Sequence, residues 1–574
     1  MRPRARRIIT AVMLGTTLGV ALALGAGLGA RYVYDEVWPW TERGAAADFR
    51  NGVGQQRITA IDVSVEVAPA DGALDAQATL TLEPRPGSAA LHLVLNPGLQ
   101  VREATVDGAA VGYRRRGRYL RVPVPGEASG HSHRVRLVYE GVPDDDAFQP
   151  VYRGEHEYIV PAYAAWYPTD LQSFTSFRCT VRAPRDWTPV FGGERVADTL
   201  EGGLRRVTWN TQRVTPGVPL ILGDYARVSR TYGQVTFRVH YPADSEPPGE
   251  APLQILSEAH AALSALLGGT GFYNFDLVLT ELATPAFHTG HAGAVLPRAL
   301  QTGDGGLFLR LARLVAQDWW GGTVGARWFS PRTEAPAWMA ASLPEYTAWE
   351  LLRAVRGRAV WLRHKEQLAV VSPDRPLNGY GIEHLAHTAG EADPALYAYG
   401  PQVANMLAEY VGTELFWSAC RRFITMHEHR TASLTAFRHE LELLAETDLD
   451  EFFRAWFERR AVFDYGISDV AVTGEMAHIS FVNAGTRVAP GALQVAVLDG
   501  GQVAWHAVRP GALGQSISVP TRGEVTQVVL DPEFVTPDHN RADNIWPARA
   551  WPQRVAATGD GEVVVVVRDA WNAQ

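Results

Sequence analysis

The stretch LARLVAQDWWGGTVGARW, residues Leu311–Trp328, lies near the middle of the chain and is the most informative segment for the fold. Apolar residues recur here at three-and-four spacing, which predicts an amphipathic helix over residues 307–320. One face of such a helix is expected to pack in a core and the opposite face to be polar. The core face contains Phe308, Leu311, Val315 and Trp319, and the polar face contains Arg310, Arg313 and Gln317.

Composition indicates a multidomain globular protein. The chain has 574 residues, of which 46% are hydrophobic, and is too long for a single core. Its formal net charge is -9, and the short arginine cluster YRRRGRY at 113–119 predicts a solvated strand or turn rather than a nucleic-acid site. The two cysteines, Cys179 and Cys420, are far apart in sequence, so we expect buried thiols and no disulfide.

The N-terminus predicts a membrane anchor. MRPRARR precedes an uncharged, mainly apolar run, Ile8–Ala30, which is long enough to cross a bilayer as a helix. The arginines that precede this run favour a cytoplasmic N-terminus. A cleaved signal peptide is the alternative, although its apolar region would be unusually long. We therefore expect a single-pass protein of the cytoplasmic membrane, with the bulk of the chain extracytoplasmic.

The remaining chain predicts a multidomain α+β fold. From Arg57 to about Arg230, runs of alternating apolar and polar residues are broken by Gly, Pro and Asp, which indicates an antiparallel β sandwich or saddle. Helical periodicity follows, and short strands return after about Gly466. We expect a cytoplasmic tip, anchor and juxtamembrane segment over 1–40, a β domain over 41–240, a mostly helical domain over 241–465, and a small β sandwich with a tail over 466–574.

This domain order resembles the M1 family of zinc aminopeptidases, which have a gluzincin fold with a thermolysin-like helical domain. The family's HExxH helix is followed by Gln-Trp-Phe-Gly or a close variant, and DWWG at 318–321 stands in that place. WMAASLPEY at 338–346 is similar to the next family segment, Trp-Leu-Asn-Glu-Gly-Phe-Ala-x-Tyr. The resemblance covers roughly residues 55–540 and implies that Trp319 and Trp338 are core residues.

The same resemblance implies a degenerate HExxH...E motif. Carried over by position, the two zinc-binding histidines fall on Arg313 and Gln317, the general-base glutamate on Leu314, and the third zinc ligand on Ala341. The loop at 287–297, where the family places the acid that binds the substrate amine, contains no acid. Of the catalytic groups, only the tyrosine that steadies the oxyanion is kept, as Tyr397.

Arg313 is poorly suited to a metal site, because a guanidinium has no lone pair and carries a positive charge towards a dication. We therefore predict no cofactor and no peptidase activity. In this interpretation Arg313, Leu314, Gln317 and Ala341 line the cleft that holds the substrate in the family. Tyr397 is a vestige of the catalytic site, and the cleft binds a peptide or protein.

An active enzyme with a nonstandard site is the alternative. In that hypothesis the chain is a metallo(amino)peptidase or another hydrolase, and zinc is held by His384, His387 and Glu391, whose spacing is compatible with a helix. The remaining histidine pairs are expected to be surface or cap residues: His288 with His291, and His427 with His429.

Overall fold

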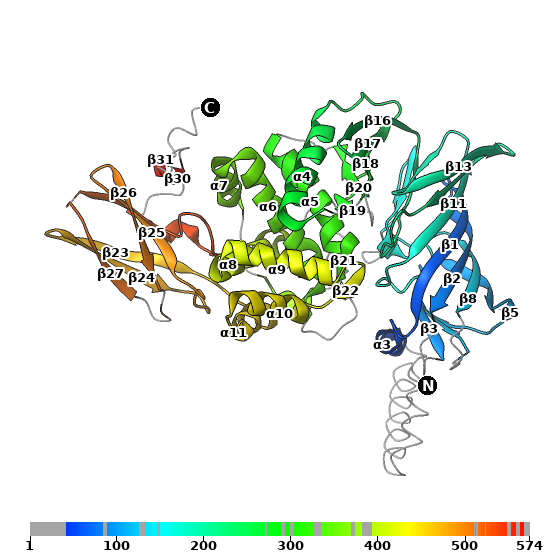
Figure 1. Ribbon diagram of the computed structural model, residues 1–574, viewed down its shortest axis with the longest axis horizontal. Helices are drawn as coiled ribbons and strands as arrows, with labels where there is room; N and C mark the ends of the chain where they lie inside the picture. Colours follow the sequence, from blue (N-terminus) through cyan, green and yellow to red (C-terminus); the bar gives the residue numbers. More distant parts are fainter. Residues whose placement is uncertain are drawn as a thin grey trace, which may run out of the picture.

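The N-terminal strands, a helical middle part and the C-terminal strands follow one another along the long axis of the molecule (Figure 1). The computed structural model describes residues 42–83, 89–125, 132–145, 150–269, 272–288, 293–298, 304–326, 334–368, 373–380, 393–509, 511, 515–522, 524–547, 553–557 and 563–567. Within these segments, no helix combines the length and the apolar character that crossing a bilayer requires. The predicted membrane span, Ile8–Ala30, lies outside the described residues.

An eight-stranded sheet forms the frame of the N-terminal domain. Its order is β13 (Glu194–Glu201), β14 (Leu204–Asn210), β11 (Ser176–Pro184), β1 (Arg57–Ala68), β2 (Ala73–Glu83), β8 (His133–Gly141), β4 (Leu99–Val106) and β5 (Ala109–Ala110). Buried and exposed side chains alternate along most of β1 and β2, as their sequences predict. β1 and β11 run parallel, so the sheet is mixed rather than purely antiparallel as expected.

Two smaller sheets and one helix complete this domain. One sheet contains β3 (Ala90–Val94), β7 (Tyr119–Pro123) and β6 (Arg114–Arg116), and the other contains β12 (Thr188–Val190), β15 (Leu220–Gly223), β10 (Glu157–Val160) and β9 (Tyr152–Arg153). Helix α3 (Glu42–Gly52) is the first described element and lies beside β3 at the lower edge of the domain (Figure 1). The first described residues therefore lie beside the sheet of β3, β7 and β6 rather than beside the eight-stranded sheet.

The helical domain has its own sheet, which begins earlier in the chain than expected. Its order is β16 (Tyr225–Tyr232), β17 (Val235–Pro242), β18 (Asn274–Thr280), β20 (Gly293–Pro297) and β19 (Phe287–His288). β17 pairs in parallel with β18, and Phe237 and Val239 of β17 share a core with Leu256 of the following helix. The predicted boundary between residues 240 and 241 therefore falls inside β17, because long-range pairing decides which domain a strand joins.

The mostly helical character predicted for the middle domain is confirmed by its longer helices. They are α4 (Ala251–Leu267), α5 (Asp304–Gln317), α6 (Leu343–Arg356), α8 (Gly400–Val411), α9 (Thr413–Met426) and α10 (Leu434–Ala445), with α7 (Arg358–Gln367) in addition. Ser433 caps α10, since its Oγ accepts a hydrogen bond from the Ala436 N–H at 3.0 Å. Trp319 and Trp338 are buried in the main core, and Cys179 and Cys420 are buried free thiols, so these predictions are also confirmed.

Two short π-helical turns, η6 (Trp338–Ser342) and η9 (Ala395–Tyr399), are in close contact and lead into α6 and α8. Trp338 Nε1 donates a hydrogen bond to the Gly400 carbonyl at 2.9 Å, and Ser342 Oγ donates to the Leu396 carbonyl at 2.7 Å. A Cβ atom on Gly400 would lie 2.2 Å from Ser342 Oγ, so this approach requires glycine. The contact fixes the residues of η9, including Tyr397, relative to η6 and α6.

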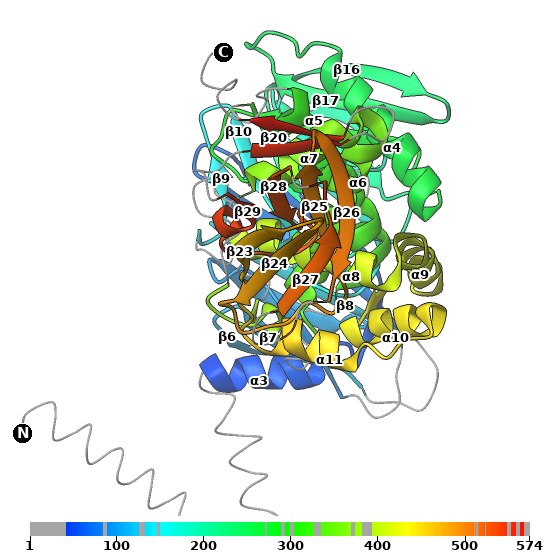
Figure 2. The same cartoon turned by 90° about the vertical axis from the view of Figure 1, so that its left-hand side faces the viewer.

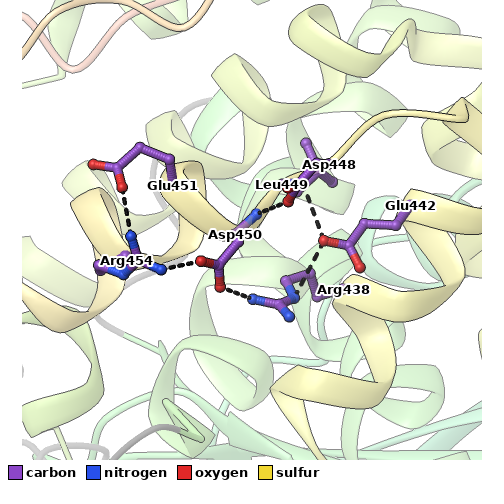
Figure 3. Close-up of polar contacts among 7 residues, drawn as sticks. All are labelled: Arg438, Glu442, Asp448, Leu449, Asp450, Glu451 and Arg454. Atoms are coloured by element: carbon purple, nitrogen blue, oxygen red, sulfur yellow. Dashed lines mark hydrogen bonds and ion pairs between the residues drawn. The ribbon is translucent and has the colours of Figure 1, made fainter.

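The end of the helical domain is held by an ionic cluster on α10 and α11 (Asp450–Phe453), shown in Figure 3. Arg438 Nη1 lies 2.8 Å from Asp450 Oδ1, and Arg454 contacts the other oxygen of the same carboxylate. Glu442 accepts the Leu449 N–H at 3.0 Å, which satisfies a backbone donor at the start of α11. These side chains are partly exposed, so the cluster orients the short helix more than it stabilises the fold.

Two stacked sheets form the C-terminal domain (Figure 2). One contains β23 (Tyr465–Thr473), β24 (Met476–Asn483) and β27 (Gln515–Pro520), and the other contains β26 (Gln502–Val508), β25 (Leu493–Asp499), β28 (Val525–Leu530) and β29 (Ile545–Trp546). The last described strand is β31 (Val563–Val567), which is paired with β30 (Gln553–Ala557). The main core continues from the helical domain into these sheets through Phe463 and Tyr465, so the two parts are packed as one unit.

Candidate functional site

Helix α5 carries the polar face on which the family's metal-binding positions would fall. Its opposite face is buried as predicted, including Leu311 and Val315. Arg313 projects away from that core and meets three elements. The first is the segment before β19, where the Ala286 carbonyl accepts a hydrogen bond from Arg313 Nη2 at 3.4 Å. The other two are α6 and η9. Arg313 therefore lies where the domain's sheet and its helices converge.

Glu345 is the ionic partner of Arg313. Arg313 Nε lies 3.7 Å from Glu345 Oε2, and the two side chains are only 11% and 13% exposed. The other carboxylate oxygen, Oε1, accepts a hydrogen bond from Trp349 Nε1 at 3.1 Å. Burial raises the pKa of Glu345 above its ordinary value, and the charge of Arg313 opposes this rise.

Sequence comparison did not identify Glu345, because the resemblance places the third zinc ligand at Ala341. A usable signal was present, since Glu345 follows Ala341 by one helical turn and so projects from the same side. If an ion pair replaced the metal, Arg313 would need an acidic partner on the side of the helix that carries Ala341. Glu345 meets this requirement.

Leu314 and Ala341 do not line an open cleft, which corrects the expectation for both residues. Leu314 is fully buried in the main core. Ala341 is fully buried in a small cluster with Tyr380 and Leu396. Both positions face packed side chains, because small or apolar residues at these positions allow α5 and η6 to close on their neighbours.

Gln317 lies one turn after Arg313 on α5 and is half-buried. Its Nε2 donates a long hydrogen bond, 3.4 Å, to the Ala340 carbonyl of η6. Its Oε1 is buried and has no hydrogen-bond partner among the described residues. Gln317 therefore ties α5 to η6, in the place where the resemblance expects a metal-binding histidine.

Tyr397 forms the third side of the site. The Arg313 guanidinium carbon lies 4.9 Å from the centre of the Tyr397 ring, a cation–π contact. Burial raises the pKa of the Tyr397 hydroxyl, and Arg313 opposes the rise. Tyr163 of the N-terminal domain interacts electrostatically with Tyr397 and also has a raised pKa, chiefly through burial. Tyr163 is therefore within electrostatic range of the site, and sequence analysis missed it because nothing local distinguishes it.

The described residues do not fit a zinc ion at the aligned positions. A guanidinium, two aliphatic side chains and one amide provide no imidazole or carboxylate where the resemblance expects ligands. Over the described part of the chain, no group of three or more His, Cys, Asp or Glu side chains is placed to hold a metal ion. The alternative ligands His384, His387 and Glu391 lie outside the described residues.

The other histidines considered as ligands have identifiable neighbours. His288 Nε2 lies 3.5 Å from the buried carboxylate of Asp318. The His427 ring packs on Phe423 and the His429 ring near Phe174. His291 lies outside the described residues. These described histidines therefore act in packing and ionic contacts.

Solved structures with a similar fold include an aminopeptidase and zinc metallopeptidases. The Legionella pneumophila aminopeptidase A in complex with aspartic acid is 14% identical, with a TM-score of 0.68 over 84% of this chain and 59% of that chain. The present chain thus spans 59% of the length of that aminopeptidase. The M1 zinc metallopeptidase from Deinococcus radiodurans is 19% identical, with a TM-score of 0.60 over 71% of this chain and 94% of that chain.

A mutant of the Deinococcus enzyme bound to a Tyr-Ser-Ala substrate is 20% identical, with a TM-score of 0.60 over 71% of this chain and 95% of that chain. No family model matches the sequence, and no curated protein matches it. The similarity to these peptidases is therefore evident from the tertiary structure and not from a sequence match.

These comparisons correct the prediction about cofactors. We expected none, but the solved structures that share the fold include zinc metallopeptidases, for which zinc is the norm. The prediction that the protein has no cofactor is therefore withdrawn. The domain order, the helical core around Trp319 and Trp338, and the structural neighbours agree with one another, and the protein has the fold of the M1 zinc aminopeptidases.

Proposed function

We propose that the protein is a membrane-anchored, extracytoplasmic M1 peptidase-like protein that binds a peptide or protein at the site around Arg313 without hydrolysing it. The proposal rests first on the Arg313–Glu345 pair, because an ion pair occupies the aligned position of a zinc-binding histidine. It rests second on the missing general base. In a peptidase of this fold a general base must reach the attacking water. Here the aligned residue is Leu314, which is fully buried and has no group that can accept a proton.

The site retains features that suit recognition of a peptide. Arg313 and Tyr397 come from different elements and combine a fixed charge with an aromatic hydroxyl. Tyr163 adds a contribution from the N-terminal domain. A similar solved structure holds a Tyr-Ser-Ala substrate, so a short peptide with a free amino end is the first ligand to examine.

A metallo(amino)peptidase with a nonstandard site is the second candidate. The observation that favours it is the shared fold with zinc metallopeptidases, and its ligands would be His384, His387 and Glu391. The two candidates differ in one measurable outcome, the fate of the peptide.

The full-length protein in a non-ionic detergent should be incubated with Tyr-Ser-Ala and longer peptides, with added zinc and with a chelator. Calorimetry reports binding, and mass spectrometry reports whether the peptide is intact. We expect bound, intact peptide in every condition. Chelator-sensitive release of tyrosine would instead establish the second candidate, and absence of both binding and cleavage would reject both.

Two neighbouring tyrosines provide a matched pair of variants. Tyr397→Phe keeps the ring against Arg313 but removes the hydroxyl, so peptide affinity should fall by about fivefold, the value of one hydrogen bond near 1 kcal/mol. Tyr399 donates a buried hydrogen bond to the Ala461 carbonyl at 3.1 Å, away from Arg313. Tyr399→Phe should lower stability and leave peptide affinity unchanged. The same loss of affinity in both variants would argue against binding at Tyr397.

A further inference from the structure

A cavity of about 260 Å³ lies in the N-terminal domain between α3 and the sheet of β3, β7 and β6. Its walls come from Phe49 on α3, His92 on β3 and the hairpin of β6 and β7. Helix α3 runs along the lower edge of the domain beside β7 (Figure 2). The cavity lies in the N-terminal domain, whereas Arg313 lies in the helical domain, and the inference below rests on the proposed function only for the predicted membrane anchor.

The lining is strongly basic. Four arginines, Arg114, Arg115, Arg116 and Arg121, line the cavity against one acid, Asp48. This excess stands out in a chain whose formal net charge is -9. Concentrated positive charge in a concave site attracts anions and raises their local concentration.

The single acid is already engaged by basic side chains of the cavity itself. Asp48 Oδ2 lies 3.3 Å from His92 Nε2 and 3.9 Å from Arg121 Nε. His92, Arg121 and Arg114 together hold the pKa of Asp48 below its ordinary value. Asp48 therefore stays ionised and compensates only part of the positive charge around it.

Arg115 and the histidine shape the cavity. Arg115 Nη2 donates to the Asn96 carbonyl at 2.7 Å, and a second nitrogen donates to the Leu99 carbonyl, so this guanidinium is fixed by backbone groups. His92 is only 8% exposed, and its Nδ1 has no hydrogen-bond partner among the described residues. The ring fits because residue 52 is glycine: a Cβ there would lie 2.2 Å from Nδ1.

Aromatic rings complete the lining. Phe49 of α3 packs against Tyr119 of β7 with ring centres 5.4 Å apart, and Tyr113 precedes the arginine run. Rings of this kind suit a ligand that has an apolar part next to a charged group. Arginine in turn presents paired N–H donors that match the oxygens of a phosphate better than a point charge does.

We propose that this cavity binds the phosphate group of an anionic ligand, with an anionic phospholipid headgroup as the source that its position favours. Helix α3 begins at residue 42, shortly after the predicted membrane span Ile8–Ala30, which would hold the cavity near the bilayer surface. Basic clusters beside a membrane anchor bind anionic headgroups, and aromatic residues favour the same interface. A soluble organic phosphate has the same recognising chemistry.

The test uses the full-length protein in uncharged detergent micelles, probed with short-chain phosphatidylglycerol, short-chain phosphatidylcholine and inorganic phosphate. Binding is followed by calorimetry and by the shift in melting temperature. Phosphatidylglycerol is expected to bind and to raise the melting temperature, and phosphatidylcholine is not. Binding of phosphatidylglycerol alone assigns a lipid headgroup, and binding of inorganic phosphate with comparable affinity assigns a soluble phosphate.

The double variant Arg114→Ala, Arg116→Ala removes two exposed arginines of the lining and leaves the structural Arg115 in place. Its affinity for the bound probe should fall at least tenfold. Arg195→Ala, Arg206→Ala is the matched control, because both arginines are partly exposed on β13 and β14 and the charge change is equal. Binding of none of the probes, or an equal loss of affinity in the control, would overturn the proposal.

Discussion

The guanidinium of Arg313 and the carboxylate of Glu345 lie 3.7 Å apart and are nearly enclosed, and Arg313 stands where the resemblance to M1 peptidases expects a zinc-binding histidine. The pair joins α5 to α6, and the Tyr397 ring covers the arginine. An arginine this deeply buried is tolerated because its charge is compensated within the site. The arrangement explains how α5 can keep its packing with Arg313 at a histidine position.

The first prediction concerns this ion pair. Arg313→Met leaves Glu345 buried without its partner and should lower the free energy of unfolding by about 3 kcal/mol near pH 7. The deficit should shrink as the pH falls towards 5, because protonation of Glu345 removes the uncompensated charge. Chemical denaturation at several pH values measures both effects.

The double variant Arg313→Met, Glu345→Leu serves as the control for that experiment. Replacing both charges with apolar side chains should restore most of the lost stability, because no unpaired charge remains in the site. If Arg313→Met alone were as stable as the unmodified protein at pH 7, the pair would have no structural role.

The second prediction concerns the tryptophans of the main core. Trp319 and Trp338 are buried, and Trp338 also packs edge-on against Phe457 with ring centres 4.8 Å apart. Replacing either with Ala should cost about 3–5 kcal/mol, since a large cavity remains. Trp505→Ala is the comparison variant, because Trp505 is 39% exposed and its loss should cost far less. Similar melting temperatures for all three variants would contradict the assigned core.

The third prediction uses Lys365, a fully buried lysine between the helical and C-terminal domains. Its Nζ has no hydrogen-bond partner in the described part of the chain and lies 4.0 Å from the Trp361 ring centre. Burial lowers the pKa of Lys365 to about 7, while Asp531 and Glu350 act in the opposite direction. Arg541 joins the same contact region by donating to the Lys365 carbonyl at 2.9 Å.

The sign of the pH dependence follows from proton uptake. Between pH 7 and the ordinary lysine pKa of about 10.5, the unfolded chain binds a proton that the folded chain lacks, so stability should rise with pH. Lys365→Met should remove this rise and be more stable than the unmodified protein near pH 7, by about 1 kcal/mol or more. Thermal unfolding from pH 7 to pH 10 measures the difference. Parallel stability curves for the two proteins would show that Lys365 is charged in the fold.

The fourth prediction concerns membrane topology. The arginines before Ile8–Ala30 favour a cytoplasmic N-terminus, so a reporter fused after Gln574 should be active only if it functions outside the cytoplasm. Reversing the charges with Arg2→Glu, Arg4→Glu, Arg6→Glu and Arg7→Glu should weaken this orientation. A fusion that is active only as a cytoplasmic reporter would reverse the proposed topology.

Local signals in the sequence were sufficient for the elements that surround the site. The apolar stripe of α5 predicted its buried face, and the cap of α10 is a serine, a residue type that favours this position. Alternating residues predicted the strands β1 and β2. These features depend on neighbours within a few residues, so the printed sequence contains the information directly.

The sequence by itself also determined which chemistry the aligned positions lack, because Arg313, Leu314, Gln317 and Ala341 are readable as residue types. Only the tertiary structure decided that Glu345 is the partner of Arg313, that β17 belongs with β18, and that Phe49 meets Tyr119 to close a basic cavity. Each of these relationships joins segments separated by tens of residues along the chain. Residue types and local periodicity leave such contacts open, because burial and packing of the whole chain select the pairs that meet.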